Sequence, residues 1–420
     1  MKRGLPTFTA LVAVLALAAG GAAHAAPGPL DLSGSLGGAN YVIKVPASWN
    51  GTLVVLAHGY RDKADHPGEV DNTAALDAGF AGIAAGLNAQ GYAVAATSYS
   101  DNGWAVKEAT QDITALTSFF RDTVAVPEST LLAGFSLGSL PTYELAERTG
   151  GMFDGFLPAC AVGAGAARAW DGGLLELLAY DVAFGIPAAW GTVADGDDDV
   201  DFESEVLPTM VGQLLNPMNF ARFEFMRLVG RVPLSPDYYP GGLLTNVFFF
   251  TEARGELERR AHGPVAQNLT HTYTIEPGDR AYLNAIGMPS ATIDSLLAAM
   301  NARRTISPAP SARNYVEHYA TFTGKIKHPV LTLHTVVDTL VPVQHEAAYA
   351  ETVAEASREG LLRQTYTSGT SHCGFSFAQV LTAIQALDAW AQTGVAPTAA
   401  AFPAALGFVP GFVPPAWPQP

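Results

Sequence analysis

Short apolar, β-rich runs alternate with helical stretches on both sides of one long interruption, and this alternation most constrains how the 420-residue chain can fold. Strands that alternate with helices of this length need right-handed crossovers and form a mainly parallel sheet. The predicted strands are Tyr41–Val45, Thr52–Ala57, Tyr92–Thr97, Thr130–Ala133, Gly155–Val162, Val330–His334 and Arg363–Thr367. The predicted helices are Asn72–Gln90, Ala105–Val124, Leu137–Arg148, Val343–Glu359 and Phe375–Thr393. The pattern predicts the α/β fold class.

The interruption, residues 164–324, is rich in Phe, Trp and Tyr and breaks the rhythm of strands and helices. Because the strand pattern resumes after it, we interpret it as a cap inserted into one α/β domain, which comprises residues 26–163 and 325–394. An independent second domain is the alternative. The tail, residues 395–420, is rich in Pro, Ala and Phe and nearly uncharged, which is typical of an extended segment that lies on the body.

The N-terminus has the composition of a targeting segment. Lys2 and Arg3 precede the apolar run Ala10–Ala19, and small residues suited to cleavage precede Ala26. We therefore predict that residues 1–25 are a cleavable secretory signal and that the mature protein is secreted or periplasmic. The apolar run is shorter than the ~18 residues that a membrane span needs, so no stable membrane anchor is expected.

Acidic residues outnumber basic residues, 39 to 23, which gives the chain a net charge of −16. This charge repels phosphate backbones, and no basic patch is present in the sequence. Nucleic acid is therefore not an expected partner.

A possible nucleophile stands in the string Gly134-Phe135-Ser136-Leu137-Gly138, between a predicted strand and a predicted helix. A serine flanked by glycines two residues before and after it, at such a junction, has the pattern of a nucleophile elbow. The tight turn that lifts the hydroxyl off the sheet leaves no room for neighbouring Cβ atoms, and glycine tolerates strained backbone. Because the chain contains 42 glycines, a Gly-x-Ser-x-Gly string is not rare by chance and is weak evidence alone. The interpretation therefore depends on a base and an acid downstream.

Both partners follow late strands of the predicted sheet. Asp338 comes four residues beyond the strand Val330–His334, and His372 lies on the turn-rich exit of the strand Arg363–Thr367. A serine hydroxyl needs a base to take its proton and a third group to orient that base. Open α/β sheets build sites at the carboxyl ends of their strands. The sequence therefore predicts a catalytic triad of Ser136, Asp338 and His372.

The oxyanion of such a reaction needs two backbone N–H groups. One is expected from Leu137, directly after the nucleophile. The strand Thr52–Ala57 runs into His58-Gly59-Tyr60, where the glycine permits a close turn and leaves the Tyr60 N–H as the second expected donor. We interpret His58 as a structural residue that holds this loop.

These motifs together resemble the α/β-hydrolase superfamily. The resemblance covers approximately residues 40–163 and 325–393 and rests on the His-Gly loop, the elbow, the Asp-x-x-Val-Pro segment and the His-x-Gly-Phe segment. It implies an α/β-hydrolase fold with the cap after the sixth strand, as in many lipases, esterases and peptidases. It also implies the roles already assigned: Ser136 as nucleophile, His372 as base, Asp338 as orienting acid, and Leu137 and Tyr60 as oxyanion donors.

Other interpretations of these residues stay open. Ser136 could be a helix N-cap, Asp338 could cap the next helix, and His372 could be an ordinary loop histidine. The rival bases, His334 and His345, lie within a strand and a helix and are interpreted as structural. The rival acids are Asp101 and Asp154.

The two cysteines, Cys160 and Cys373, suggest a disulfide if the chain is secreted; two separate buried thiols are the alternative. A cysteine directly after the histidine is similar to tannase and feruloyl esterases, but their partner cysteine directly precedes the serine, where this chain has Phe135. Candidate pocket residues are Tyr60, Phe135, Trp104, Trp170, Trp190 and Phe248–Phe250.

The loop at residues 195–201 is rich in aspartate and invites a calcium interpretation, but Val200 and Val206 occupy the positions where an EF-hand has Gly and Glu. We interpret it as a solvated acidic loop. No metal and no organic cofactor is expected. The predicted function is hydrolysis of carboxylic esters through an acyl-enzyme on Ser136. The alternatives are a serine exopeptidase of the same fold and a non-catalytic binding protein on this scaffold.

Overall fold

The computed structural model describes residues 28–62, 82–196 and 199–417. The predicted signal segment, residues 1–25, lies outside the described residues, as does the first part of the predicted helix Asn72–Gln90. No helix in these ranges is long and apolar enough to cross a membrane.

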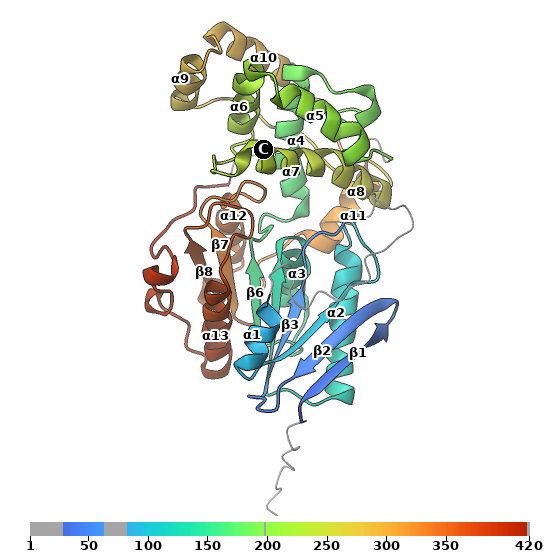
Figure 1. Ribbon diagram of the computed structural model, residues 1–420, viewed down its shortest axis with the longest axis vertical. Helices are drawn as coiled ribbons and strands as arrows, with labels where there is room; N and C mark the ends of the chain where they lie inside the picture. Colours follow the sequence, from blue (N-terminus) through green and yellow to red (C-terminus); the bar gives the residue numbers. More distant parts are fainter. Residues whose placement is uncertain (1–27, 63–81, 197–198, 418–420) are drawn as a thin grey trace, which may run out of the picture.

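One eight-stranded sheet forms the base of the molecule in Figure 1, with the strand order β1-β2-β4-β3-β5-β6-β7-β8. Strands β3 to β8 run parallel to one another, and β2 pairs antiparallel with both β1 and β4. The predicted α/β class is therefore confirmed. The bounds are β1 Leu30–Leu36, β2 Ala39–Val45, β3 Thr52–Ala57, β4 Ala93–Thr97, β5 Ser129–Phe135, β6 Gly155–Ala159, β7 Val330–Thr335 and β8 Leu362–Thr367.

The central strands are apolar on both faces because helices cover both faces. Along β3, Leu53 and Val55 belong to one core cluster and Val54 and Leu56 to the other, as the two-residue period of a strand requires. The first cluster also contains α2 Val106–Thr123, α3 Ser139–Arg148 and α12 Gln344–Glu355, and the second contains α1 Ile83–Ala89 and α13 Phe377–Thr393.

Two of the differences from the sequence prediction, in β1 and β6, have a clear physical cause. Strand β1 was not predicted, because its sequence LDLSGSL is poor in β-branched and aromatic residues and its side chains are largely exposed at the sheet edge. Strand β6 ends at Ala159 rather than Val162, because Cys160 adopts a left-handed backbone with φ 42°.

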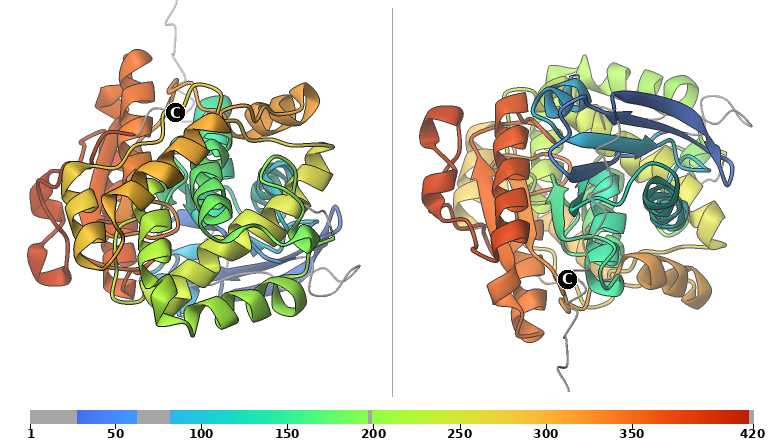
Figure 2. Two further views of the ribbon diagram at one scale, coloured as in Figure 1. Left: turned by 90° about the horizontal axis from the view of Figure 1, so that it is seen from above. Right: turned by 90° about the horizontal axis from the view of Figure 1, so that it is seen from below.

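A helical layer connects β6 to β7 and lies over the carboxyl ends of the strands (Figures 1 and 2). Its helices are α4 Ala166–Phe184, α5 Leu207–Leu214, α6 Phe220–Val229, α7 Leu243–Phe248, α8 Arg254–Ala261, α9 Pro277–Ala285, α10 Ser290–Ala302 and α11 Pro310–Ala320. We call this layer the cap. It covers the edge of the sheet where the candidate residues lie.

Candidate active site

Ser136 lies in the sharp turn between β5 and α3 and has a left-handed backbone, with φ 54°. A residue other than glycine rarely adopts a left-handed backbone unless the surrounding structure holds it in that conformation. The flanking glycines provide that structure. A Cβ at Gly138 would lie 2.6 Å from the carbonyl oxygen of His58, and one at Gly134 would lie 2.7 Å from the carbonyl carbon of Gly138. Both glycines are therefore required for the close contact between this turn and its neighbours.

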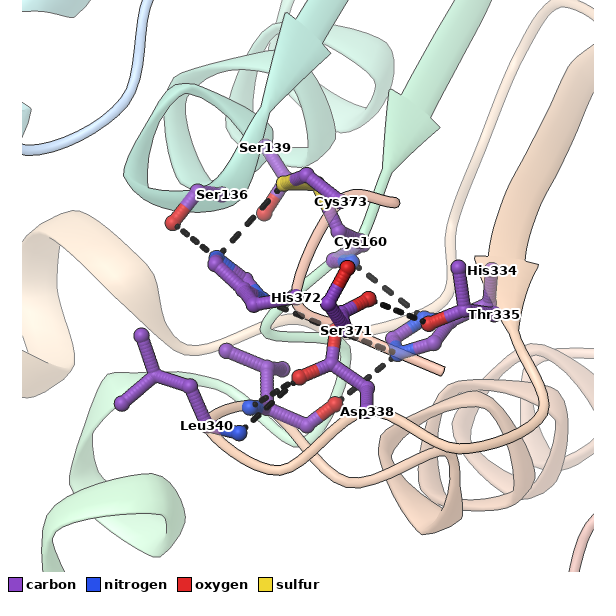
Figure 3. The surroundings of a disulfide bond; sticks show 12 residues. Ser136, Ser139, Cys160, His334, Thr335, Asp338, Leu340, Ser371, His372 and Cys373 are labelled. Atoms are coloured by element: carbon purple, nitrogen blue, oxygen red, sulfur yellow. Dashed lines mark hydrogen bonds and ion pairs between the residues drawn. A yellow bond between two sulfur atoms is a disulfide. The ribbon is translucent and has the colours of Figure 1, made fainter. Parts of the chain in front are cut away.

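Three residues that are far apart in the sequence meet at this turn (Figure 3). The Oγ of Ser136 lies 2.8 Å from Nε2 of His372, and Nδ1 of His372 lies 2.8 Å from Oδ2 of Asp338. The imidazole comes from the loop after β8 and the carboxylate from the loop after β7. An ionised carboxylate only accepts hydrogen bonds, so Nδ1 donates to Asp338 and Nε2 is left to accept from the serine hydroxyl.

Asp338 is fully buried, and its other oxygen, Oδ1, accepts from the backbone N–H groups of Leu340 and Val341 at 3.0 and 2.8 Å. Burial raises the pKa of the Asp338 carboxyl. The charge and hydrogen bond of His372, together with the Val341 N–H, outweigh burial and hold the pKa below its ordinary value. The carboxylate is therefore charged at neutral pH and fixes the orientation of the imidazole.

The loop after β3 lies directly beside Ser136. A Cβ at Gly59 would lie 3.3 Å from the Cβ of Ser136. Within the described ranges, neither the Tyr60 N–H nor the Leu137 N–H donates a hydrogen bond, so both remain available to a ligand. His58 holds the loop: its ring stacks on Tyr99 at 3.9 Å, and its Nε2 lies 3.2 Å from the Ser98 carbonyl oxygen.

A disulfide joins Cys160, which follows β6, to Cys373, which follows the candidate base. The prediction of this bridge is confirmed, and the alternative of two separate thiols is wrong. Both cysteines have left-handed backbones, and the Sγ of Cys373 lies 3.5 Å from Nε2 of His372. The bridge therefore fixes the histidine loop to the end of a central strand (Figure 3).

A pocket opens over Ser136 between the sheet and the cap and encloses about 1140 Å³ of empty space, its open mouth included. His372, which contacts Ser136, is not fully buried: 20% of its side chain is exposed. The walls are mainly apolar or aromatic and include Tyr60, Trp104, Trp170, Glu176, Phe249, Phe250 and Trp417.

Phe135 does not line the pocket, so that prediction is wrong. Its side chain is 1% exposed and packs with Leu131 and Ala133 in the cluster beneath α13. Alternation along β5 places it on the sheet face, away from the hydroxyl that follows it. Trp190 and Phe248 are also absent from the pocket lining, although the Phe248 ring lies 5.9 Å from that of Tyr60.

Several polar side chains interrupt the apolar wall, among them those of Tyr60, Trp170 and Glu176. Among the described residues, the hydroxyl of Tyr60 and the indole N–H of Trp170 have no hydrogen-bond partner, although both atoms are buried. Glu176 is buried and accepts from Nδ2 of Asn246 at 3.2 Å; the same amide nitrogen donates to the Thr339 carbonyl oxygen at 3.1 Å. Burial raises the pKa of Glu176 to about 8. At neutral pH Glu176 therefore keeps its proton and adds no charge to the pocket wall.

The rival candidates occupy other environments. His334 is fully buried between Glu346 and the Val341 carbonyl oxygen, at 3.2 and 2.9 Å. His345 accepts from the Ala164 N–H, and burial lowers its pKa to about 3. Asp101 pairs with Arg260 on the cap, and Asp154 accepts from the Thr130 N–H at the opposite end of β5. None of these residues contacts Ser136.

In the part of the chain that the structure describes, one group of potential metal ligands is close enough to share an ion: Cys160, His372 and Cys373. Both sulfurs belong to the disulfide, so they offer no thiolate. In the acidic loop, Asp201 caps the turn Phe202–Val206, and the Gly196 N–H donates to Glu258. Residues 197–198 lie outside the described residues.

Sequence reasoning missed Glu176, Asn246 and Trp417. Glu176 lies on α4, and Asn246, which donates to it, lies on α7; no sequence pattern in the interruption marks either position. Trp417 had a signal: it is a large aromatic residue near the end of a Pro-rich, uncharged tail.

The strand order and the position of the elbow after β5 give the chain the α/β-hydrolase fold. Similar solved structures include feruloyl esterase B from Aspergillus oryzae, with 13% identity, 88% of this chain and 80% of that chain covered, and a TM-score of 0.40. Tannin acyl hydrolase from Aspergillus niger has 13% identity, 88% and 79% coverage, and a TM-score of 0.43. Proline iminopeptidase from Mycobacterium smegmatis has 14% identity, 86% and 97% coverage, and a TM-score of 0.39. No family model and no curated protein matches the chain.

Proposed function

We propose that this chain, which has the α/β-hydrolase fold, is a serine hydrolase that cleaves carboxylic esters through an acyl-enzyme on Ser136. The observation that carries the proposal is the continuous chain of hydrogen bonds from Ser136 through His372 to Asp338, with the serine opening into an apolar pocket. This arrangement supplies a nucleophile, its base and the group that orients the base.

The geometry supports the following reaction. Nε2 of His372 takes the proton of Ser136 while Oγ attacks the ester carbonyl carbon, and the N–H groups of Tyr60 and Leu137 stabilise the oxyanion. The imidazolium then gives its proton to the departing alcohol, which leaves an acyl group on Oγ. His372 next takes a proton from water, the resulting nucleophile attacks the acyl carbon, and the acid departs as Ser136 regains its proton. The charged Asp338 stabilises the imidazolium at both stages.

The pocket supports an ester rather than a peptide substrate. Its walls are mainly aromatic and aliphatic, which suits the apolar acyl and alcohol groups of an ester. The exopeptidase alternative has one observation in its favour, because Glu176 could receive a substrate amine. A carboxyl whose pKa is about 8 holds its proton at neutral pH, however, and a neutral acid is a weak partner for an ammonium group.

A fluorophosphonate that labels active serines tests the proposal. We expect it to label the wild-type protein and to fail on Ser136→Ala. A panel of p-nitrophenyl esters beside aminoacyl anilides then identifies the substrate class, with esters expected to be the better substrates. Absence of labelling in folded wild-type protein would favour the non-catalytic binding protein, and faster anilide cleavage would favour the exopeptidase.

The proposal includes export of the protein. The Cys160–Cys373 disulfide supports it, because such bridges persist in oxidising compartments. Expression of the full chain in a secreting host, followed by N-terminal sequencing of the released protein, should give a new N-terminus at Ala26. Retention of Met1 on the product would contradict export.

A further inference from the structure

The tail returns to the active site. After α13, it runs antiparallel beside the end of β8: Phe408 forms an antiparallel bridge with Thr367, and the Gly407 carbonyl oxygen accepts from the Ser368 N–H at 2.9 Å. Phe402 and Phe408 are buried in the cluster beneath α13. The tail is therefore fixed to the strand whose loop carries His372, and its path leads on towards the cap (Figure 1).

Near its end, this segment buries one large side chain. Val413 is 81% exposed, whereas Trp417, four residues later, is 8% exposed. The indole ring of Trp417 lies 4.5 Å from the ring of His345, centroid to centroid, and the guanidinium carbon of Arg168 lies 5.3 Å above it. An aromatic face close to an arginine is a favourable cation–π contact.

The two partners of Trp417 belong to different layers. His345 is on α12 in the sheet domain, and Arg168 is on α4 in the cap. Both residues line the pocket over Ser136, and so does the indole itself. Burial keeps His345 neutral, with a pKa lowered to about 3, so the imidazole presents an uncharged ring to the indole at any ordinary pH. The indole thus fills the junction of the sheet domain and the cap at the wall of the pocket.

We propose that Trp417 is a specificity-determining residue, whose indole forms a wall of the pocket and limits the size of the ester group that fits beside Ser136. This inference rests on the proposed function. Apolar pockets discriminate through the space they offer: one methylene more or less changes kcat/KM by about 10- to 200-fold. A side chain as large as indole therefore has a large effect on chain-length preference.

The test measures kcat/KM for p-nitrophenyl esters from acetyl to palmitoyl, together with acetate esters of alcohols of increasing length. In Trp417→Ala we expect the ratio of long-chain to short-chain kcat/KM to rise by about tenfold or more in one of the two series. Trp417→Phe should give an intermediate ratio, and a chain that ends at Pro415 should behave as Trp417→Ala does. Val413→Ala, an exposed position on the same tail, is the matched control and should leave the profile unchanged.

The outcomes separate this inference from the proposed function. Fluorophosphonate labelling of the wild-type protein tests the chemistry of Ser136 alone. If the wild type labels and the Trp417 variants label at the same rate with an unchanged chain-length profile, the inference is wrong and the function stands. Should Trp417→Ala unfold, Trp417→Leu keeps an apolar group at the buried position, and an unchanged ratio in that variant overturns the inference equally.

Discussion

Gly59 and Ser136 lie so close together that a Cβ on the glycine would be 3.3 Å from the Cβ of the serine. The loop that carries the Tyr60 N–H is thus placed by direct contact with the nucleophile. In Gly59→Ala, the added methyl group displaces this N–H by a few tenths of an ångström. A displaced N–H stabilises the oxyanion less well. We therefore expect kcat to fall by about 10- to 100-fold with little change in Tm. Steady-state kinetics and thermal melting check this, and full activity would show that the loop is not an oxyanion donor.

Asp338→Asn should lower kcat by about four orders of magnitude while the fold is retained. The amide can donate to Nδ1, which stabilises the tautomer that has no free Nε2 lone pair for the serine proton. The matched control is Asp154→Asn, because that carboxyl accepts from the Thr130 N–H at the other end of β5 and an amide oxygen can do the same. Ester hydrolysis by the two variants checks the prediction, and equal activities would place the acid elsewhere.

Removal of the disulfide in Cys160→Ser/Cys373→Ser should destabilise the protein by about 2–5 kcal/mol, since the bridge closes a loop of 213 residues. It should also lower kcat, because Cys373 directly follows His372. Urea unfolding and ester hydrolysis measure the two effects. A thiol reductant should reproduce both effects in the wild type and have none on the double variant. A reduced wild type that is as stable and as active as before would contradict this role.

Glu176→Gln should remove a pH dependence of stability. Burial raises the pKa of Glu176 from 4.5 to about 8, so between these pH values the folded protein keeps a proton that the unfolded chain has released. Rising pH therefore favours unfolding in this window, by about 1.4 kcal/mol per pH unit from this group.

Urea unfolding from pH 4 to pH 9 compares the two proteins. The stability of the wild type should fall relative to Glu176→Gln as the pH rises from about 4.5 to about 8 and then run parallel to it. Glu359→Gln, at an exposed position, is the control and should follow the wild type throughout. Parallel curves for Glu176→Gln and the wild type would show that the acid is not neutral in the folded protein.

The sequence was sufficient to predict those parts of the fold and the site that depend on a local residue pattern. The bounds of β3 were predicted from its apolar run alone, and the convergence of Ser136, Asp338 and His372 followed from the rule that parallel strands present their carboxyl ends at one edge. Their catalytic roles stay predictions until activity is measured.

Tertiary context decided the rest. Phe135 is adjacent to Ser136 in the chain but faces the opposite side of the sheet, because the left-handed turn at Ser136 separates their directions. β1 is held by pairing with β2 rather than by its own propensity. Trp417 lines the pocket at the end of a tail that pairs with β8 at Phe408. No periodicity in a sequence encodes such contacts.

The bridge between Cys160 and Cys373 has a practical consequence for anyone who produces this protein. Synthesis in a reducing cytoplasm would yield chains in which the loop of His372 lacks its covalent attachment to β6. In such preparations the sheet and the cap would be intact, but the imidazole of His372 would be poorly positioned. Low kcat would then result from the missing disulfide and not from the properties of the native active site. Export to an oxidising compartment, or refolding with a glutathione pair, is therefore the proper starting point for every assay described above.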